Sequence, residues 1–226
     1  MFPRHCPACD TIVTPYGNLI CESCHGQMRY LGNVSCKKCG KKLKIAQDEY
    51  CPDCIRKPHL FDQGRALYEY ESIRPGLYRL KYGGRKEYAE FFAIELSLFL
   101  RAQIQEWNAD ALVPVPLHRS RERKRGYNQA QLLAEHLGKQ LGIPVCSNLI
   151  KRRKRTIPQK ELTLPQRQNN LKKAFKLCQN DVKLRTIIII DDIFTTGSTM
   201  DAMALEFKQA GVENVYFITL AIGEGF

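Results

Sequence analysis

Paired cysteines are the most regular chemical feature of this 226-residue sequence. Eight of its ten cysteines form four Cys-x-x-Cys pairs at an even spacing, and one such turn offers two thiolates to a metal, whereas Zn²⁺ takes four in a tetrahedron. Equal spacers separate successive pairs, and turn-prone residues in the first and third spacers favour a site made by two neighbouring pairs. Because the spacers are equal, a cross-braced arrangement stays open. The sequence therefore predicts two structural zinc sites, with Cys6, Cys9, Cys21 and Cys24 at the first and Cys36, Cys39, Cys51 and Cys54 at the second.

A second chemical feature is the stretch TIIIIDDIFTTGST, residues 186–199. Four isoleucines are typical of a parallel strand covered on both faces, and ligands collect where such strands end. The helix predicted to follow would offer unpaired N–H groups and a dipole that favours a phosphate. The carboxylates suit the vicinal hydroxyls of a sugar or a Mg²⁺ ion. The stretch thus predicts a site for a ribose 5-phosphate, formed by Asp191, Asp192, Thr195, Thr196, Gly197, Ser198 and Thr199.

Positive charge is concentrated in one part of the chain. The net charge is +12, and residues 111–176 alone contain 16 basic and 3 acidic residues. Two basic runs contribute most, Arg119 to Arg125 and KRRKR at residues 151–155. They either form solvated faces or contact pyrophosphate or a DNA backbone, since clustered positive charge is typical of surfaces that bind polyanions. Tyr16 and Tyr127 are candidates for stacking on bases. The candidate groups for pyrophosphate or DNA are Arg119, Arg121, Arg123, Arg125, Asn128, Gln129, Gln159 and Arg167.

The elements that must position these groups alternate between strand and helix. We expect strands at residues 65–72, 111–117, 143–150, 183–192 and 214–222, with helices at 73–84, 86–107, 128–142 and 198–211. This alternation predicts an α/β fold with an open, mostly parallel sheet. The 25 residues or so after residue 150 have no clear period, as a functional or disordered loop would.

Length and composition divide the chain into two parts. Residues 1–57 have too little apolar periodicity to form a core without metal, so we expect a zinc-ribbon module there and an α/β domain over residues 58–226. No apolar run approaches the roughly 20 residues of a membrane span, and the start shows no signal-peptide pattern. We therefore expect a soluble, cytoplasmic protein.

Two sets of residues carry a resemblance to known families. The stretch IIIIDDIFTTGST resembles the signature of type I phosphoribosyltransferases, which implies that phosphoribosyl pyrophosphate binds with Mg²⁺. VPVPLHRSRERKRGYNQAQLLA, PHLFD and the cysteine array resemble the ComF family, in which a zinc ribbon precedes a phosphoribosyltransferase-like domain. The resemblance also includes Thr156, Gln159, Leu162, Arg167, Asn170 and Phe175. It implies a role in natural transformation and DNA uptake, in which the protein handles single-stranded DNA at the inner face of the membrane with a ComF-type helicase.

Three functions are compatible with these features. The chain is an enzyme that transfers phosphoribose with release of pyrophosphate, a DNA-handling adaptor that binds phosphoribosyl pyrophosphate, or a scaffold. Transfer requires a pocket for the acceptor as well as a grip on the leaving pyrophosphate. The sequence predicts residues that bind the pyrophosphate, but it indicates neither an acceptor pocket nor a catalytic residue. It therefore favours the adaptor.

Overall fold

The fold was analysed in a computed structural model that describes residues 3–32, 34–153, 174–178 and 183–223. The central sheet consists of β1 (Gln63–Glu69), β6 (Asn214–Ile222), β5 (Thr186–Phe194) and β2 (Ala111–Pro114) in that order, with all three pairings parallel. Ala111 lies beside Ile187, and Ile188 lies beside Tyr216. The open parallel sheet predicted from the sequence is confirmed.

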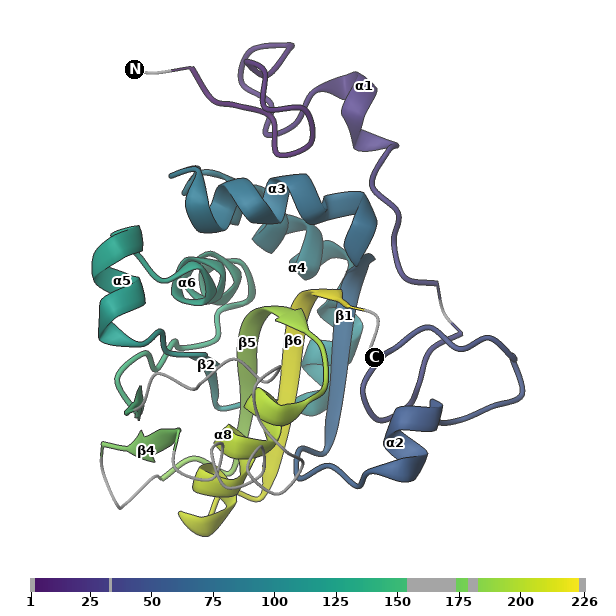
Figure 1. The fold of residues 1–226 in the computed structure, drawn as a ribbon, viewed down its shortest axis with the longest axis vertical. Helices are drawn as coiled ribbons and strands as arrows, with labels where there is room; N and C mark the ends of the chain where they lie inside the picture. The colour runs from purple at the N-terminus through teal and green to yellow at the C-terminus, as the bar shows by residue number, and fades with distance from the viewer. Residues whose placement is uncertain (1–2, 33, 154–173, 179–182, 224–226) are drawn as a thin grey trace.

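Helices cover both faces of this sheet (Figure 1). On one face α4 (Tyr88–Trp107) packs on α6 (Gln129–Leu141), and α3 (Tyr70–Tyr82) lies above them. On the other face lie α8 (Ser198–Gln209) and a small antiparallel hairpin of β3 (Ile150–Arg152) and β4 (Phe175–Leu177). The short helix α5 (Arg119–Arg125) follows β2 in the chain and lies at the edge of the molecule beside α6 (Figure 1). The carboxyl ends of β5 and β6 therefore point toward α3.

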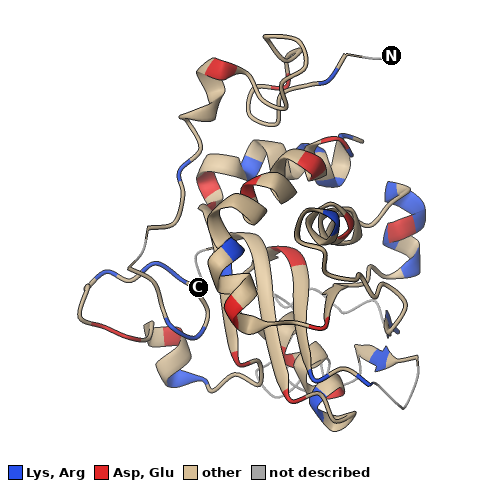
Figure 2. Ribbon diagram, turned by 180° about the vertical axis from the view of Figure 1, so that it is seen from behind, with Lys and Arg blue, Asp and Glu red and all other residues tan. Residues whose placement is uncertain are grey.

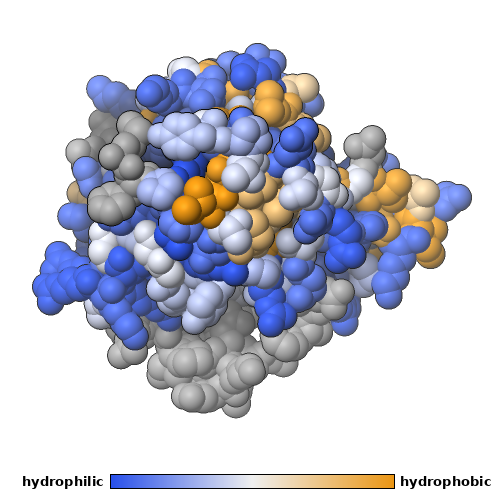
Figure 3. All heavy atoms as spheres, turned by 90° about the horizontal axis from the view of Figure 1, so that it is seen from above, coloured by the Kyte–Doolittle hydropathy of each residue, from blue (hydrophilic) through white to orange (hydrophobic). Residues whose placement is uncertain are grey.

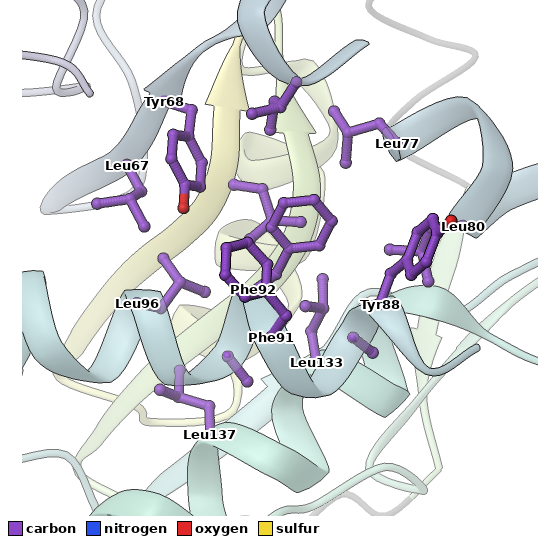
Figure 4. Close-up of a cluster of buried hydrophobic side chains, with 14 of the residues drawn as sticks. Leu67, Tyr68, Leu77, Leu80, Tyr88, Phe91, Phe92, Leu96, Leu133 and Leu137 are labelled. Carbon is purple, nitrogen blue, oxygen red and sulfur yellow. The ribbon is translucent and has the colours of Figure 1, made fainter. Parts of the chain in front are cut away.

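Alternation along the central strands divides the core in two. Ile188 and Ile190 of β5 belong to the cluster with α3, α4 and α6, whereas Ile187 and Ile189 belong to the cluster with α8. In the first cluster, side chains from these three helices and β1 converge, and Phe92 is fully buried (Figure 4). Since both faces of β5 are covered, its uninterrupted apolar run is explained.

The two cysteine-rich segments pack on different sides of the α/β domain. Ribbon one (residues 3–32), which contains α1 (Glu22–His25), lies over α3, and ribbon two (residues 34–57), which contains α2 (Pro52–Arg56), lies beside β1 (Figure 1). Between them the chain runs antiparallel to β1, where Leu31 N donates to Leu67 O at 2.8 Å. This segment covers an otherwise open sheet edge.

Most expected elements are present, with shifted ends. The strand expected at residues 143–150 is reduced to one isolated bridge, between Val145 and Leu112, and only Ile150 enters a strand. Pro144 explains this difference, because its missing N–H cannot join a ladder. Within the described ranges no helix has both the length and the apolar character that a membrane crossing requires.

Candidate zinc centres and phosphate site

Two clusters of four cysteines lie in the ribbons, one in each. Cys6, Cys9, Cys21 and Cys24 form the first and Cys36, Cys39, Cys51 and Cys54 form the second, and within each set the sulfur atoms lie within 4.8 Å of one another. Cys39 Sγ and Cys51 Sγ are 3.7 Å apart. A Zn–S bond of about 2.3 Å in a tetrahedron places two sulfur atoms about 3.8 Å apart, so the donor set fits zinc. The cysteines group as neighbouring pairs, and the cross-braced arrangement is not formed.

Asp191 and Asp192 follow the isoleucine run of β5, and the structure gives them different partners. The buried Asp192 forms an ion pair with Lys81 of α3 and accepts a hydrogen bond from Gln129 Nε2 at 2.9 Å. Asp191 is half-buried, and its Oδ1 accepts from the backbone N–H of Asp192 at 2.9 Å. Asp191 is thus the member of the pair that is better placed to meet a ligand.

The two carboxyl groups also differ in charge. Burial raises the pKa of Asp191 well above its ordinary value, and the charge of Asp192 raises it further. Burial opposes the ionisation of Asp192 as well, but the Lys81 ammonium and the Gln129 amide hold the pKa of Asp192 below its ordinary value. Because Lys81 balances Asp192, the pair presents less negative charge to an anion than the sequence suggests.

The five residues 195–199 form an open turn at the start of α8. Thr195 and Thr196 are exposed, and the Thr196 and Ser198 hydroxyl oxygens lie 2.9 Å apart. Gly197 has φ +74°, a left-handed conformation that side chains other than glycine rarely adopt, and the helix begins at Ser198. The unpaired N–H groups and the hydroxyls therefore lie at a helix N-terminus, where phosphate binds readily.

A buried histidine supports this turn from behind. The His59 side chain is 4% exposed, and its Nδ1 lies 2.9 Å from a carboxylate oxygen of Asp201 in the first turn of α8. Leu60 N also donates to Asp201, at 3.0 Å. A methyl group on Gly197 would lie 2.6 Å from the His59 ring, so ring and turn are in close contact. The linker after ribbon two thus fixes the start of α8.

The basic residues of α5 lie at the edge of the molecule, beside α6 (Figure 2). Arg119, Arg121 and Arg123 are exposed, whereas Arg125 is half-buried and donates to Gln129 Oε1. Because Gln129 in turn donates to Asp192, one chain of hydrogen bonds joins α5 to the acidic pair.

Two other predicted contact groups have structural partners. Asn128 caps α6, since its Oδ1 accepts from Ala130 N and its Nδ2 donates to Val115 O. Tyr127 is buried, and its hydroxyl donates to Leu80 O, so this ring packs in the core and does not stack on bases. Tyr16 is 79% exposed in ribbon one. Gln159 and Arg167 lie outside the described residues.

Two residues at the site, Lys81 and His59, were not among the predicted site residues, and a third, Arg152, was predicted only as part of the run KRRKR. Lys81 lies on α3, far along the chain from its partner Asp192, and His59 lies in the linker. Arg152 lies on β3, where its guanidinium is 5.3 Å from the Phe175 ring centre and interacts with Asp191. In the sequence, His59 is marked only by the motif PHLFD and Arg152 only by the run KRRKR, and no motif marks Lys81.

Comparison with protein families matches both parts of the chain. Residues 1–55 match the double zinc ribbon domain, and residues 123–224 match the phosphoribosyl transferase domain. The second match contains β5, the turn and α8, and it supports the predicted fold class.

Among individual relatives, competence protein F of Haemophilus influenzae is 40% identical over 114 residues, which is 50% of each chain. DNA utilization protein YhgH of Escherichia coli is 34% identical, over 58% of this chain and 59% of its own. Competence protein ComFC of Bacillus subtilis is 32% identical, over 65% of this chain and 58% of its own. The chain therefore spans about half or somewhat more of the length of these relatives. The two cysteine clusters, the phosphoribosyltransferase motif at the end of β5 and these relatives together support a resemblance to ComFC.

Proposed function

We propose that this protein binds phosphoribosyl pyrophosphate with Mg²⁺ and acts in natural transformation, where it handles incoming single-stranded DNA. The observation that carries the proposal is the junction of β5 and α8, where a half-buried carboxylate lies a few residues before an open, hydroxyl-rich helix N-terminus. A sugar that carries both a diol and a 5-phosphate matches these two features.

Each part of the ligand has a partner in this proposal. Residues 195–199 hold the 5-phosphate through N–H and hydroxyl groups, and Asp191 holds the ribose hydroxyls or Mg²⁺. Asp192 orients the site through its ion pair with Lys81. Carboxylate and hydroxyl oxygens are the ligands that Mg²⁺ takes, and the ion would neutralise the pyrophosphate charge.

The role in DNA handling rests on the relatives and on charge. Two relatives are named competence proteins and one a DNA utilization protein, and α5 presents exposed arginines beside the candidate site. The ComF resemblance further suggests a helicase partner at the inner face of the membrane. Arg119, Arg121 and Arg123 are the proposed contacts to the DNA backbone.

Calorimetry with Mg²⁺ tests the sugar-phosphate site directly. We expect binding at micromolar to millimolar ligand, and a loss of at least about tenfold for Asp191→Asn, because the amide cannot replace the carboxyl group as a ligand of Mg²⁺. Asp48→Asn, at an exposed position of ribbon two, is the control and should bind as the native chain does. The absence of any heat at millimolar ligand would refute the site.

Salt titration tests the DNA contacts. Replacing Arg119, Arg121 and Arg123 with Gln should weaken the binding of an oligodeoxythymidylate and reduce the slope of log K against log salt by about 2, since each phosphate contact on a single strand contributes about 0.7. The control replaces three exposed cations elsewhere, Lys44, Arg101 and Lys139. Equal slopes for the two triple variants would contradict a DNA contact at α5.

Catalytic transfer of phosphoribose is a second candidate function, because the phosphoribosyltransferase motif is unbroken from Ile187 to Thr199. The assay is release of pyrophosphate from phosphoribosyl pyrophosphate with nucleobases or single-stranded DNA as acceptor. Release that Asp191→Asn abolishes would establish an enzyme, whereas tight binding without release would leave the adaptor.

A further inference from the structure

The exposed side of α3 forms a groove that ends at the acidic pair. This groove has a volume of about 480 Å³, and its lining includes Tyr70, Arg74, Tyr78, Lys81, Tyr82 and Ile193. Ile193 directly follows Asp192 in β5, and Lys81 forms the ion pair with Asp192. The groove therefore lies next to the proposed ribose site.

Two tyrosine rings in the groove are unusually open to solvent. Tyr78 is 63% exposed and Tyr82 is 66% exposed, although tyrosine normally buries much of its ring. Their spacing of four places them on one side of the helix, with ring centres 5.1 Å apart and planes inclined by 48°. Leu77 and Leu80, which are close to them in sequence, are buried in the core. The tyrosines thus form an aromatic surface that stays largely open in the described part of the chain.

Cations border this aromatic surface. The Arg125 guanidinium lies 5.0 Å from the centre of the Tyr82 ring, and the same side chain donates to Gln129, which donates to Asp192. Arg125 and Lys81 thus connect the groove to the acidic pair from two sides. A base stacked on the face of a tyrosine ring, with a guanidinium alongside and cations near its phosphate, is a usual form of nucleobase recognition.

The composition of this side of the molecule argues against an apolar partner. Viewed from above, the surface is largely hydrophilic, and hydrophobic residues form small separate patches (Figure 3). An apolar helix or a lipid surface requires a continuous apolar area. Tyrosine and arginine instead supply stacking faces together with positive charge.

We propose that the α3 groove is a nucleobase-binding site, in which a base stacks on Tyr78 and Tyr82 beside Arg125. The base belongs either to single-stranded DNA or to a free nucleobase that approaches the ribose. The inference rests on the proposed function for the nature of its ligand, and it supplies the acceptor-side pocket that the sequence did not indicate.

The test compares Tyr78→Ala plus Tyr82→Ala with Tyr78→Phe plus Tyr82→Phe. Both pairs of changes lie at exposed positions, so the fold should be kept, and only the Phe variant keeps the stacking faces. Fluorescence anisotropy with a labelled oligodeoxythymidylate should show between about 5-fold and 150-fold weaker binding for the Ala variant and near-native binding for the Phe variant. An abasic oligonucleotide of the same length should bind all three proteins alike.

A second arm uses adenine as the probe, followed by saturation-transfer NMR. Tyrosine-dependent binding of the oligonucleotide alone assigns the groove to DNA, and tyrosine-dependent binding of adenine assigns it to a free base. If neither probe responds to the Ala changes, or if the abasic chain loses as much affinity as the normal one, the inference is overturned. Calorimetry with phosphoribosyl pyrophosphate on the same variants should be unchanged, so failure of the sugar-phosphate site is seen separately.

Discussion

The two zinc ribbons repeat one cysteine pattern, yet they attach to the α/β domain in different ways. The buried cysteines of ribbon one belong to the core cluster of α3 and α4, whereas those of ribbon two belong to the cluster of α8. Their metal sites depend on the same local spacing, but their contacts do not. The comparison indicates that each ribbon supports a different wall of the candidate site.

Ribbon one supports α3, the helix that carries Lys81 and the exposed tyrosines. Asp10 interacts with Arg85 at 2.9 Å and Arg79 at 3.4 Å, and Arg79 also donates to Ala8 O at 3.2 Å. The approach is close, since a methyl group on Gly76 would lie 2.4 Å from Pro7 O. Loss of ribbon one should therefore disturb the groove more than residues 195–199, the proposed phosphate turn.

Ribbon two supports the start of α8 through its linker. Lys57, at the end of the ribbon, lies 3.1 Å from the Asp201 carboxylate that also binds His59. The ribbon itself contacts β1, where Gly64 N donates to Lys38 O at 2.8 Å. Loss of ribbon two should therefore disturb the phosphate turn more than the groove.

Removal of one zinc at a time should give the largest effect. Structural zinc sites contribute about 10–16 kcal/mol of binding free energy in isolated peptides, so a site that loses two ligands should lose its fold. Cys6→Ser plus Cys9→Ser should keep one zinc by elemental analysis and lose binding in the α3 groove. Cys36→Ser plus Cys39→Ser should also keep one zinc but lose at least about tenfold in affinity for phosphoribosyl pyrophosphate. If both variants lost groove binding and affinity for phosphoribosyl pyrophosphate to the same extent, the proposed difference between the ribbons would be wrong.

Alanine at the glycine of each interface should have the next largest effect. Overpacking typically costs about 1–3 kcal/mol, so Gly76→Ala should lower the free energy of unfolding by this amount. Gly40→Ala should cost about 1 kcal/mol more, because Gly40 has φ +75° and its added methyl would lie 2.8 Å from Gly64 O. Urea unfolding measures both. Gly26→Ala is the control, since Gly26 has φ −75° and no atom within 4 Å of the added methyl. Gly76→Ala as mild as Gly26→Ala would show that ribbon one is not closely packed on α3.

Removal of the His59 side chain should have a moderate effect. His59→Ala leaves the half-buried Asp201 carboxylate without its side-chain partner from the linker. We expect this change to cost about 1–3 kcal/mol of stability and to weaken binding of phosphoribosyl pyrophosphate. Lys57→Ala removes an exposed partner of the same carboxylate and should cost less than about 1 kcal/mol. Thermal unfolding and calorimetry on both variants provide the measurement. Equal effects of the two changes would mean that burial of His59 does not matter.

Acidification should give the smallest and most gradual effect. Burial raises the pKa of Asp10, but the Tyr88 and Arg85 hydrogen bonds and the nearby guanidinium charges hold it below its ordinary value. A depressed native pKa stabilises the fold above the unfolded value of about 3.9, and this stabilisation disappears as pH falls toward the native pKa. The melting temperature should therefore fall below about pH 4, and less steeply in Asp10→Asn. A parallel fall in the two proteins would exclude Asp10 as a contributor.

Local sequence signals determined the metal sites, the central strand and the phosphate turn. Cysteine spacing predicted two four-cysteine sites because one turn supplies two ligands, although the equal spacers left a cross-braced pairing open. The isoleucine run predicted β5 because a strand covered on both faces is apolar throughout. Gly197 and the neighbouring hydroxyl residues were also predicted from the sequence, since a tight turn before a helix depends on adjacent residues. These features depend on a few neighbouring positions.

Only the tertiary structure decided what surrounds the turn. Lys81 neutralises Asp192 from a helix that lies 111 positions earlier in the chain, and His59 meets Asp201 from the linker. The sequence also did not show that Asn128 caps α6 and is therefore not free to bind a ligand. Nor did it show that Tyr127 lies in the core whereas Tyr78 and Tyr82 are exposed. Pairings between distant residues and the exposed fraction of a ring follow from how helices pack on the sheet, and no local pattern encodes that packing.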